Sequence, residues 1–165
     1  MLIAGRPLLD HIIDRLGGLH TQARLVIATT NEASDDAIEA YCDQRSVVCF
    51  RGSETDVLAR YFHCAERYGF DQIVRLTGDN PFIDVEELDR LIELHLESGN
   101  DFTQSFKALP EGVGAEIFTF EALARSHYEG YESNHREHVD EYILEHPESF
   151  QSGALEVDEG KRHPD

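Results

Sequence analysis

The chain has 165 residues, a length that suits one domain with a single hydrophobic core. Its 33 acidic and 14 basic residues give a formal net charge of −19. Such a surface repels the phosphates of nucleic acids and anionic lipid headgroups, so we expect neither nucleic acid nor membrane as a partner. A small phosphorylated ligand is still compatible, because a divalent cation or a few local Arg residues can reverse the field within one pocket.

The cysteines and the apolar runs indicate a cytoplasmic protein. Cys42, Cys49 and Cys64 are odd in number and lack C-x-x-C spacing, which argues against a disulfide framework or a structural zinc. No apolar run approaches the roughly 20 residues of a membrane span. We therefore predict one cytoplasmic domain covering residues 1–165.

The predicted elements alternate between helices and strands along the chain. Helices are expected at about 8–16, 34–44, 55–68, 85–97, 119–128 and 135–145, and strands at about 25–28, 47–50, 72–76, 101–105, 115–118 and 150–157. Strands separated by helices of this length predict parallel βαβ units, so the fold class is α/β, with three layers and a mostly parallel sheet. The first helix has no predicted strand before it, and residues 129–134 are expected to form a mobile loop.

The segment 73–84 carries the strongest chemical signal. It reads as a buried strand followed by Thr77-Gly78-Asp79-Asn80-Pro81. Ligands of open α/β sheets bind at the carboxyl ends of strands, so Asp79 is placed where a ligand for a hard cation belongs. Gly78 would let a ligand approach the backbone closely. The alternative is that Asp79 and Asp84 only cap turns and the next helix, which is the favoured interpretation of Asp84.

A second segment, residues 50–58, also follows a strand and opens a helix. Its small residues and exposed amides could receive a base, a ribose or a phosphate at the helix N-terminus. An ordinary capping arrangement explains the same residues, with Ser53 or Thr55 as the cap and Asp56 favourable to the helix dipole. From this segment alone the capping interpretation is favoured.

Seven short segments of the chain, taken together, resemble a known family. They are Gly5-Arg6-Pro7-Leu8-Leu9, Ala28-Thr29-Thr30, Arg51-Gly52-Ser53, Asp56-Val57-Leu58, Arg60-Tyr61, Arg75-Leu76-Thr77-Gly78-Asp79-Asn80-Pro81 and Arg136-Glu137-His138-Val139. Their order is similar to that of the cytidylyltransferase-like family, and more narrowly of the spore coat polysaccharide biosynthesis protein F type, related to synthetases of CMP-activated acidic sugars. The resemblance implies a Rossmann-like fold of the nucleotide-diphosphosugar-transferase type.

The resemblance also implies a reaction, in which a sugar hydroxyl attacks the α-phosphate of CTP with Mg²⁺ as cofactor and gives a CMP-sugar and pyrophosphate. It makes Asp79 the catalytic metal ligand. Nucleotide-binding roles are implied for Arg51, Gly52, Ser53 and Asp56, and roles in binding the sugar substrate for Arg75, Glu116, Glu137 and His138. The implied partners are a nucleotide and a sugar, with a homodimer as a further expectation.

The sequence departs from the family pattern at both ends. Family members begin with a strand and a glycine-rich, basic loop that wraps the triphosphate, and this chain starts just after that point. They also continue past a segment like Lys161-Arg162-His163-Pro164 into a strand with a further acidic motif. Gly114 stands where the family often has Asp. We therefore expect a chain truncated at both ends, lacking the first strand and loop, with weak or no catalysis on its own.

Three other interpretations of these residues are possible. Gly78-Asp79 followed by Asp84 mimics the acidic fourth motif of haloacid-dehalogenase-type phosphatases, but their nucleophile pair is absent after the strand at 25–28. A non-catalytic binding or assembly module that keeps the fold is the more serious alternative. His135 and His138 could bind a transition metal, but no third ligand is evident, and a solvated or acceptor-facing pair is favoured.

Overall fold

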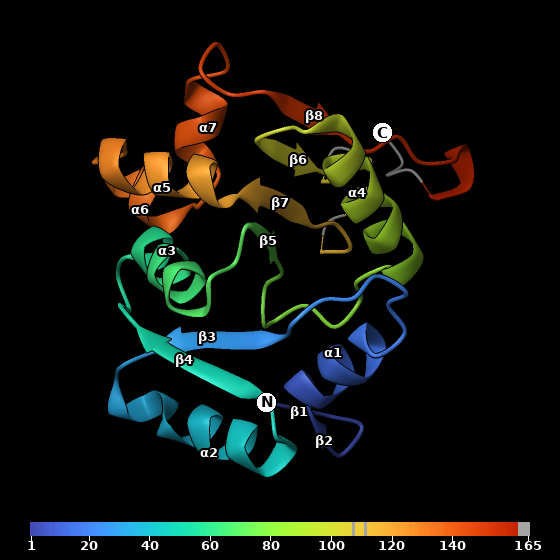
Figure 1. The fold of residues 1–165 in the computed structure, drawn as a ribbon. Coiled ribbons are helices and arrows are strands. Elements are labelled where there is room, and N and C mark those ends of the chain that lie inside the picture. Colours follow the sequence, from blue (N-terminus) through green and yellow to red (C-terminus); the bar gives the residue numbers. More distant parts are fainter. Residues whose placement is uncertain (107, 111, 162–165) are drawn as a thin grey trace. The chain divides into compact units, whose positions relative to one another are not determined.

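The computed structural model describes residues 1–106, 108–110 and 112–161. It divides into two compact units, each discontinuous in the sequence. Unit 1 consists of Met1–Gln22, Val74–Phe118 and Gln151–Asp165, and unit 2 consists of Ala23–Ile73 and Thr119–Phe150. Figure 1 labels the helices and strands of both units.

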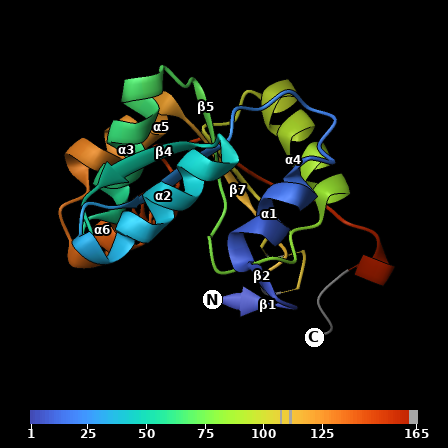
Figure 2. The same cartoon turned by 90° about the horizontal axis from the view of Figure 1, so that it is seen from below.

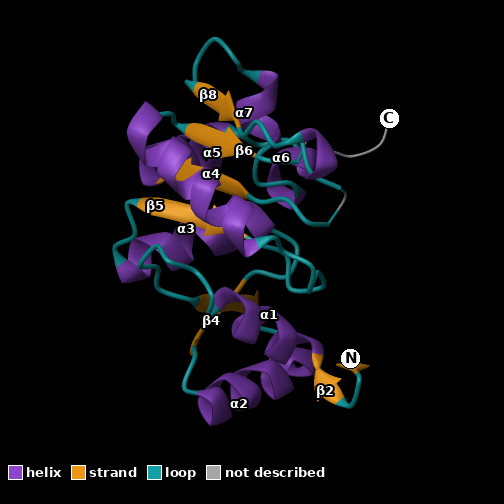
Figure 3. Ribbon diagram, turned by 90° about the vertical axis from the view of Figure 1, so that its right-hand side faces the viewer, coloured by secondary structure: helices purple, strands orange, loops and turns teal. Residues whose placement is uncertain are grey.

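Unit 1 is built around a four-stranded sheet with the strand order β5-β7-β6-β8. Its elements are β1 (Leu2–Ile3), β2 (Arg6–Pro7), α1 (Leu8–Leu16), α4 (Val85–Ser98), β6 (Phe102–Gln104), β7 (Glu116–Thr119), β8 (Ser152–Ala154) and η2 (Glu159–Lys161). The first two residues of β5 (Gln72–Arg75) and the last residue of β7 are assigned to unit 2. Strand β6 pairs antiparallel with β7 and parallel with β8. Figure 3 labels β5, β6 and β8 of this sheet.

The core of unit 1 lies between α4 and the sheet. Leu88, Leu91 and Ile92 follow the i, i+3, i+4 spacing of a helix that buries one face, and they cluster with Ile117 of β7 and Leu155 after β8. The helix begins with Asp84 as its N-cap, whose side chain accepts the amide hydrogens of the first turn, and it ends at Gly99 in the left-handed conformation. The capping interpretation of Asp84 is thereby confirmed.

Unit 2 combines two parallel strands with five α-helices in the described residues. Its elements are β3 (Val26–Thr30), η1 (Ala33–Asp35), α2 (Asp36–Arg45), β4 (Val48–Gly52), α3 (Val57–Tyr68), α5 (Phe120–Glu129), α6 (Ser133–Glu137) and α7 (Glu141–Glu145). The register of β3 and β4 runs from Val26 opposite Val48 to Thr30 opposite Gly52. Figure 2 shows α2 lying along β4.

The predicted α/β class is confirmed, although the strands fall into more than one sheet. Besides the four-stranded sheet, β3 pairs with β4, and β1 forms a short antiparallel hairpin with β2 just before α1. The sheet of unit 1 is also mixed, since β6 pairs antiparallel with β7 and parallel with β8, and no helix stands among the described residues between β6 and β7. The alternation of strands and helices predicts the order of elements, and it does not predict which strands pair.

The single helix predicted at 135–145 is wrong, because two short helices stand there. His138 is extended and ends α6, and α7 begins at Glu141. His135 Nε2 lies 2.7 Å from Glu145 Oε2, so α7 folds back beside α6. In one continuous helix these two residues would lie roughly 15 Å apart along the axis. The late strand predicted at 150–157 is also shorter, covering only Ser152–Ala154.

The buried His95 makes unit 1 sensitive to acid. His95 is 2% exposed, and its Nδ1 lies 2.8 Å from the Thr103 hydroxyl. Burial lowers the pKa of His95 below its ordinary value of 6.5. The folded state therefore keeps the ring neutral while the unfolded chain still binds a proton, so the free energy of unfolding falls as the pH drops from above 6.5 through the folded pKa.

Urea unfolding between pH 8 and pH 5.5 tests this prediction. We expect His95→Gln to flatten the fall in stability with decreasing pH, leaving a smaller slope from His127, whose pKa burial also lowers. An unchanged slope in His95→Gln would contradict the assignment.

Candidate functional site

A cavity of about 580 Å³ lies in unit 1. The described residues that line it are Ile12, Arg75, Leu76, Thr77, Asp79, Asn80, Ile83, Phe106, Leu109, Gly112 and Gly114. Its walls combine aliphatic and aromatic side chains with a few polar groups, which is the usual composition of a pocket for a small molecule. One basic and one acidic side chain, Arg75 and Asp79, belong to this lining.

The first wall is the turn that follows β5. The Asn80 amide hydrogen points to the Thr77 carbonyl oxygen at 3.4 Å, and Asn80 Oδ1 accepts the amide hydrogen of Phe82 at 3.2 Å. A side-chain amide that bonds the backbone two residues on is a common way to fix a turn. The turn presents Asp79, which is exposed, to the cavity at the end of a strand. The sequence placed an acidic side chain at this strand end, and its role there stays a prediction.

The second wall is the loop between β6 and β7. It closes at its base, where the Ser105 amide donates to the Ala115 carbonyl and the Ala115 amide donates to the Ser105 hydroxyl, at 3.0 and 2.9 Å. A Cβ atom at Gly112, where φ is +83°, would lie 2.7 Å from Asn80 Nδ2. A Cβ atom at Gly114 would lie 2.8 Å from the Phe106 ring. These two glycines therefore let the loop pack closely around the cavity.

Behind the cavity, a buried ion pair joins two strands. Glu116 at the start of β7 is fully buried, and its Oε1 accepts a hydrogen bond from Arg75 Nη1 at the end of β5. The Arg75 side chain keeps 17% of its surface exposed and lines the cavity. Glu116 contacts Arg75 and is absent from the described lining, and the sugar contact that the resemblance implies for Glu116 stays a prediction.

The oxygen donors around Asp79 determine whether Mg²⁺ can bind there. The described residues contain no group of three or more His, Cys, Asp or Glu side chains placed to hold a metal ion. Asp79 offers one carboxylate, and Thr77 and Asn80, which also carry oxygen atoms, line the same cavity. Mg²⁺ usually takes one or two carboxylates and fills its other positions with water and substrate phosphates. The donor set therefore fits an ion that arrives with a nucleotide.

Arg51 in unit 2 is held by its own surroundings. Its guanidinium donates to the carbonyl oxygens of Thr30 and Glu32 and to the carboxylates of Asp36 and Glu39, the last three at 2.8 to 3.0 Å. These bonds fasten the end of β4 to η1 and α2. Arg51 thus has a structural role, and the nucleotide contact implied by the resemblance stays a prediction.

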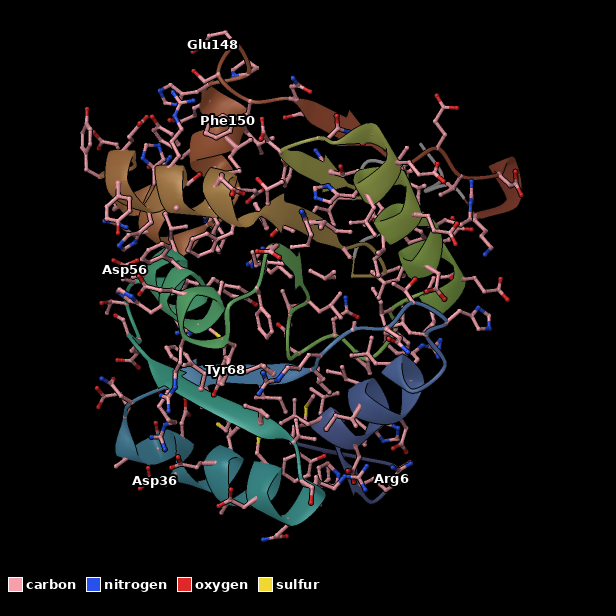
Figure 4. The ribbon with its side chains drawn as sticks, in the orientation of Figure 1. Arg6, Asp36, Asp56, Tyr68, Glu148 and Phe150 are labelled. Atoms are coloured by element: carbon pink, nitrogen blue, oxygen red, sulfur yellow. The ribbon has the colours of Figure 1, made fainter. Side chains whose placement is uncertain are left out.

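The remaining residues of the second segment form the entrance to α3. A Cβ atom at Gly52 would meet Arg60 Cγ at 2.9 Å, so this glycine lets Arg60 cross the strand. Ser53 Oγ accepts the Asp56 amide hydrogen at 3.0 Å, and Asp56 caps α3 by accepting the Ala59 amide hydrogen at 2.8 Å. Figure 4 labels Asp56 at this position. The capping interpretation holds, with Asp56 rather than Ser53 or Thr55 as the N-cap.

Helix α6 approaches this entrance through Arg136. Its Nε lies 3.6 Å from Asp56 Oδ2, and its Nη1 lies 3.2 Å from His127 Nδ1. The His127 ring stacks on Phe62 with centroids 4.3 Å apart, and the pKa of His127 is lowered by burial and then by the charge of Arg136. The sequence analysis missed this network because His127 belongs to no motif.

The other side chains of residues 135–138 differ in their exposure to solvent. Glu137 and His138 are exposed, which leaves their predicted contact with a sugar untested. His135 is buried, with Nε2 on Glu145 and Nδ1 accepting the Glu132 amide hydrogen at 3.3 Å. His135 therefore acts as a structural link between α6 and α7. The favoured interpretation of His135 and His138 as a solvated pair is wrong for His135, which is 4% exposed.

The fold and the strand-end cavity define the class of the protein, an α/β protein with a cavity of a size suited to a small molecule. A synthetase of CMP-2-keto-3-deoxy-manno-octonic acid, solved with CTP, shares this fold with a TM-score of 0.68 over 95% of this chain and 82% of its own, at 12% identity. A profile of the family described as cytidylyltransferase matches residues 1–164. The chain belongs to the cytidylyltransferase family.

Individual relatives agree with this assignment. A cytidylyltransferase from Leptospira borgpetersenii is 31% identical, with a TM-score of 0.89 over 96% of this chain and 68% of its own. The spore coat polysaccharide biosynthesis protein SpsF of Bacillus subtilis is 40% identical over 85% of this chain and 58% of its own length. The uncharacterized protein MJ1063 of Methanocaldococcus jannaschii is 37% identical over 95% of this chain and 64% of its own length.

This chain therefore spans about three fifths of the length of the curated relatives it matches. None of the helices in the described part of the chain has the length and apolar character that crossing a bilayer requires. The expected homodimer and cytoplasmic location stay predictions.

The glycines of the cavity allow a test of its construction. A Cβ atom at Gly78 would meet only Leu9 Cδ2, at an ordinary 3.9 Å, so we expect Gly78→Ala to change the unfolding free energy by less than about 0.5 kcal/mol. Gly114→Ala forces a methyl group against the Phe106 backbone and ring and should cost about 1–3 kcal/mol. Urea unfolding measures both, and an equal loss in the two variants would contradict the described packing.

Proposed function

We propose that the chain is the part of a nucleotidyltransferase that transfers CMP from CTP to a sugar. The observation that carries the proposal is Asp79, exposed at the end of β5 and lining a cavity with polar and apolar walls. A carboxylate in this position suits a magnesium nucleotide, because the ion can use one protein oxygen and several phosphate oxygens. Membership of the cytidylyltransferase family supports the reaction class.

The proposed reaction is a group transfer that needs neither an oxidant nor a reductant. A sugar hydroxyl oxygen forms a bond to the α-phosphorus of CTP, the bond from that phosphorus to the bridging oxygen breaks, and pyrophosphate leaves as the hydroxyl proton passes to solvent. Bound Mg²⁺ would neutralise charge on the phosphates. The protein's part is to position Asp79 against the phosphates and to surround the reacting groups with the apolar walls of the cavity, which limit competing water.

The sugar substrate is proposed from the relatives. The name of SpsF refers to a polysaccharide of the spore coat, and the solved synthetase that shares this fold makes a CMP-activated sugar acid. We infer a sugar that is activated for a surface polysaccharide or glycoconjugate. In this proposal Arg51, Gly52, Ser53 and Asp56 lie on the nucleotide side, as the sequence resemblance implies.

A second candidate is a non-catalytic binding module that retains the fold. Two observations favour it. The described lining of the cavity contains one carboxylate only, and Arg51 is already bonded to carbonyl and carboxylate oxygens. Such a module would bind its ligand without any dependence on a divalent cation.

Binding of CTP with and without Mg²⁺, measured by titration calorimetry, separates the two candidates. We expect Mg²⁺ to strengthen CTP binding and Asp79→Asn to remove most of that gain. Mg²⁺-dependent binding should weaken by at least about 10-fold, because the substitution replaces the charged carboxylate that binds the ion with a neutral amide. The control is Asp84→Asn, since Asn also caps helices and Asp84 lies outside the described lining.

The outcomes are distinct. Mg²⁺-dependent CTP binding that survives Asp84→Asn and fails in Asp79→Asn supports the transferase. Binding that ignores Mg²⁺ and both substitutions supports the binding module, and absence of CTP binding by the wild-type chain would remove the nucleotide from the proposal.

A further inference from the structure

In the ion pair between Arg75 and Glu116, the carboxylate is buried and the Arg75 side chain is partly exposed at the cavity. Glu116 is fully buried, so its carboxylate requires a cation, and Arg75 supplies it from the neighbouring strand. Yet the Arg75 side chain is not fully enclosed with its partner. Arg75 lines the cavity that also contains Asp79, and 17% of its side-chain surface is exposed.

Stability alone does not explain this arrangement. Burying a charged pair costs several kcal/mol of desolvation, and two apolar side chains of similar volume are often as stable or more stable. The same unit has a second buried carboxylate, Glu87, whose partner Arg90 reaches outward and is 48% exposed. Glu87 is held by Lys161 as well, and neither Glu87 nor Arg90 belongs to the described lining of the cavity.

The guanidinium of Arg75 has the geometry of an anion receptor. It is planar, stays charged at all ordinary pH values, and presents a fork of N–H donors that matches the oxygens of a carboxylate or a phosphate. The bond to Glu116 fixes one edge of this fork and restricts the rotation of the side chain. A receptor that is already oriented loses less conformational entropy when its ligand binds.

We propose that Arg75 is the anion-recognition residue of the cavity and that Glu116 is the positioning residue that orients it. The ligand group is an oxyanion on a substrate, and the proposal rests on the proposed function only for the identity of that substrate. In this proposal Asp79 and Arg75 bind different groups in one cavity. The carboxylate binds a cation, and the guanidinium binds an anion.

Two sources could supply this oxyanion, the polyphosphate of CTP and the carboxylate of a sugar acid. Titration calorimetry on the whole chain distinguishes them with four probes: pyrophosphate, Mg·CTP, 2-keto-3-deoxy-manno-octonic acid and the neutral sugar mannose. We expect Arg75→Gln to weaken binding of at least one anionic probe roughly 10- to 100-fold, as the loss of a charge-assisted hydrogen bond implies. Arg75→Lys should restore part of the loss, and Arg90→Gln should match wild type.

The pattern of losses identifies the source. Weaker pyrophosphate and Mg·CTP with an unchanged sugar acid assigns Arg75 to the polyphosphate, and the reverse assigns it to the carboxylate. The proposal is overturned if the wild-type chain binds no anionic probe, or if Arg75→Gln and Arg90→Gln bind all probes equally. A wild type that binds the sugar acid or pyrophosphate but not Mg·CTP refutes the proposed transferase and still tests the anion site.

A double-substitution series tests the positioning role of Glu116. Glu116→Gln keeps the shape and removes the charge, so it should weaken anion binding by roughly 3- to 10-fold in the wild-type background. In the Arg75→Gln background the same change should add nothing to the loss of anion binding, because Glu116 acts through Arg75. Equal losses in both backgrounds would overturn the positioning role, and the unfolding midpoint of each variant separates a loss of binding from a loss of structure.

Discussion

A fully buried carboxylate must be matched by a cation, and this constraint fixes much of unit 1. Glu116 begins β7 opposite Gln104 of β6, and the Arg75 guanidinium meets it from β5. The bond sets where β5 ends relative to β7, and the chain leaves β5 directly into the turn that carries Asp79. The position of the cavity therefore depends on an interaction that lies behind its wall.

Unit 2 uses its charged groups mainly for its own construction. Arg51 ties β4 to the start of α2, Asp56 caps α3, and the His135–Glu145 bond folds α7 beside α6. Asp35 accepts hydrogen bonds from the hydroxyls of Thr29 and Thr30, which lower its pKa to about 2. The high acidic content of the chain is thus partly explained by caps and local bonds, and a charge pattern alone does not identify a ligand site.

The sequence predicts the elements of this fold better than its contacts. Helix 8–16 and the strand ahead of Asp79 follow from local periodicity and from Gly and Pro positions, which the structure confirms. The break at His138 could not be predicted, because it depends on His135 meeting Glu145 across a turn. Four of the eleven described lining residues come from the loop with Gly112 and Gly114, and their place in the cavity, like the interior position of Glu116, emerges only from the three-dimensional packing.

The central claim is that Asp79 brings a divalent metal nucleotide into this cavity. Mn²⁺ accepts the same oxygen ligands as Mg²⁺ and broadens nearby nuclear magnetic resonances. In an ¹⁵N spectrum of the chain with CTP, the account predicts that Mn²⁺ selectively broadens the amides of residues 77–80 and 112–114, and that Asp79→Asn prevents this. The claim would be contradicted if these amide signals stayed sharp in the presence of Mn²⁺, or if their broadening persisted unchanged in Asp79→Asn.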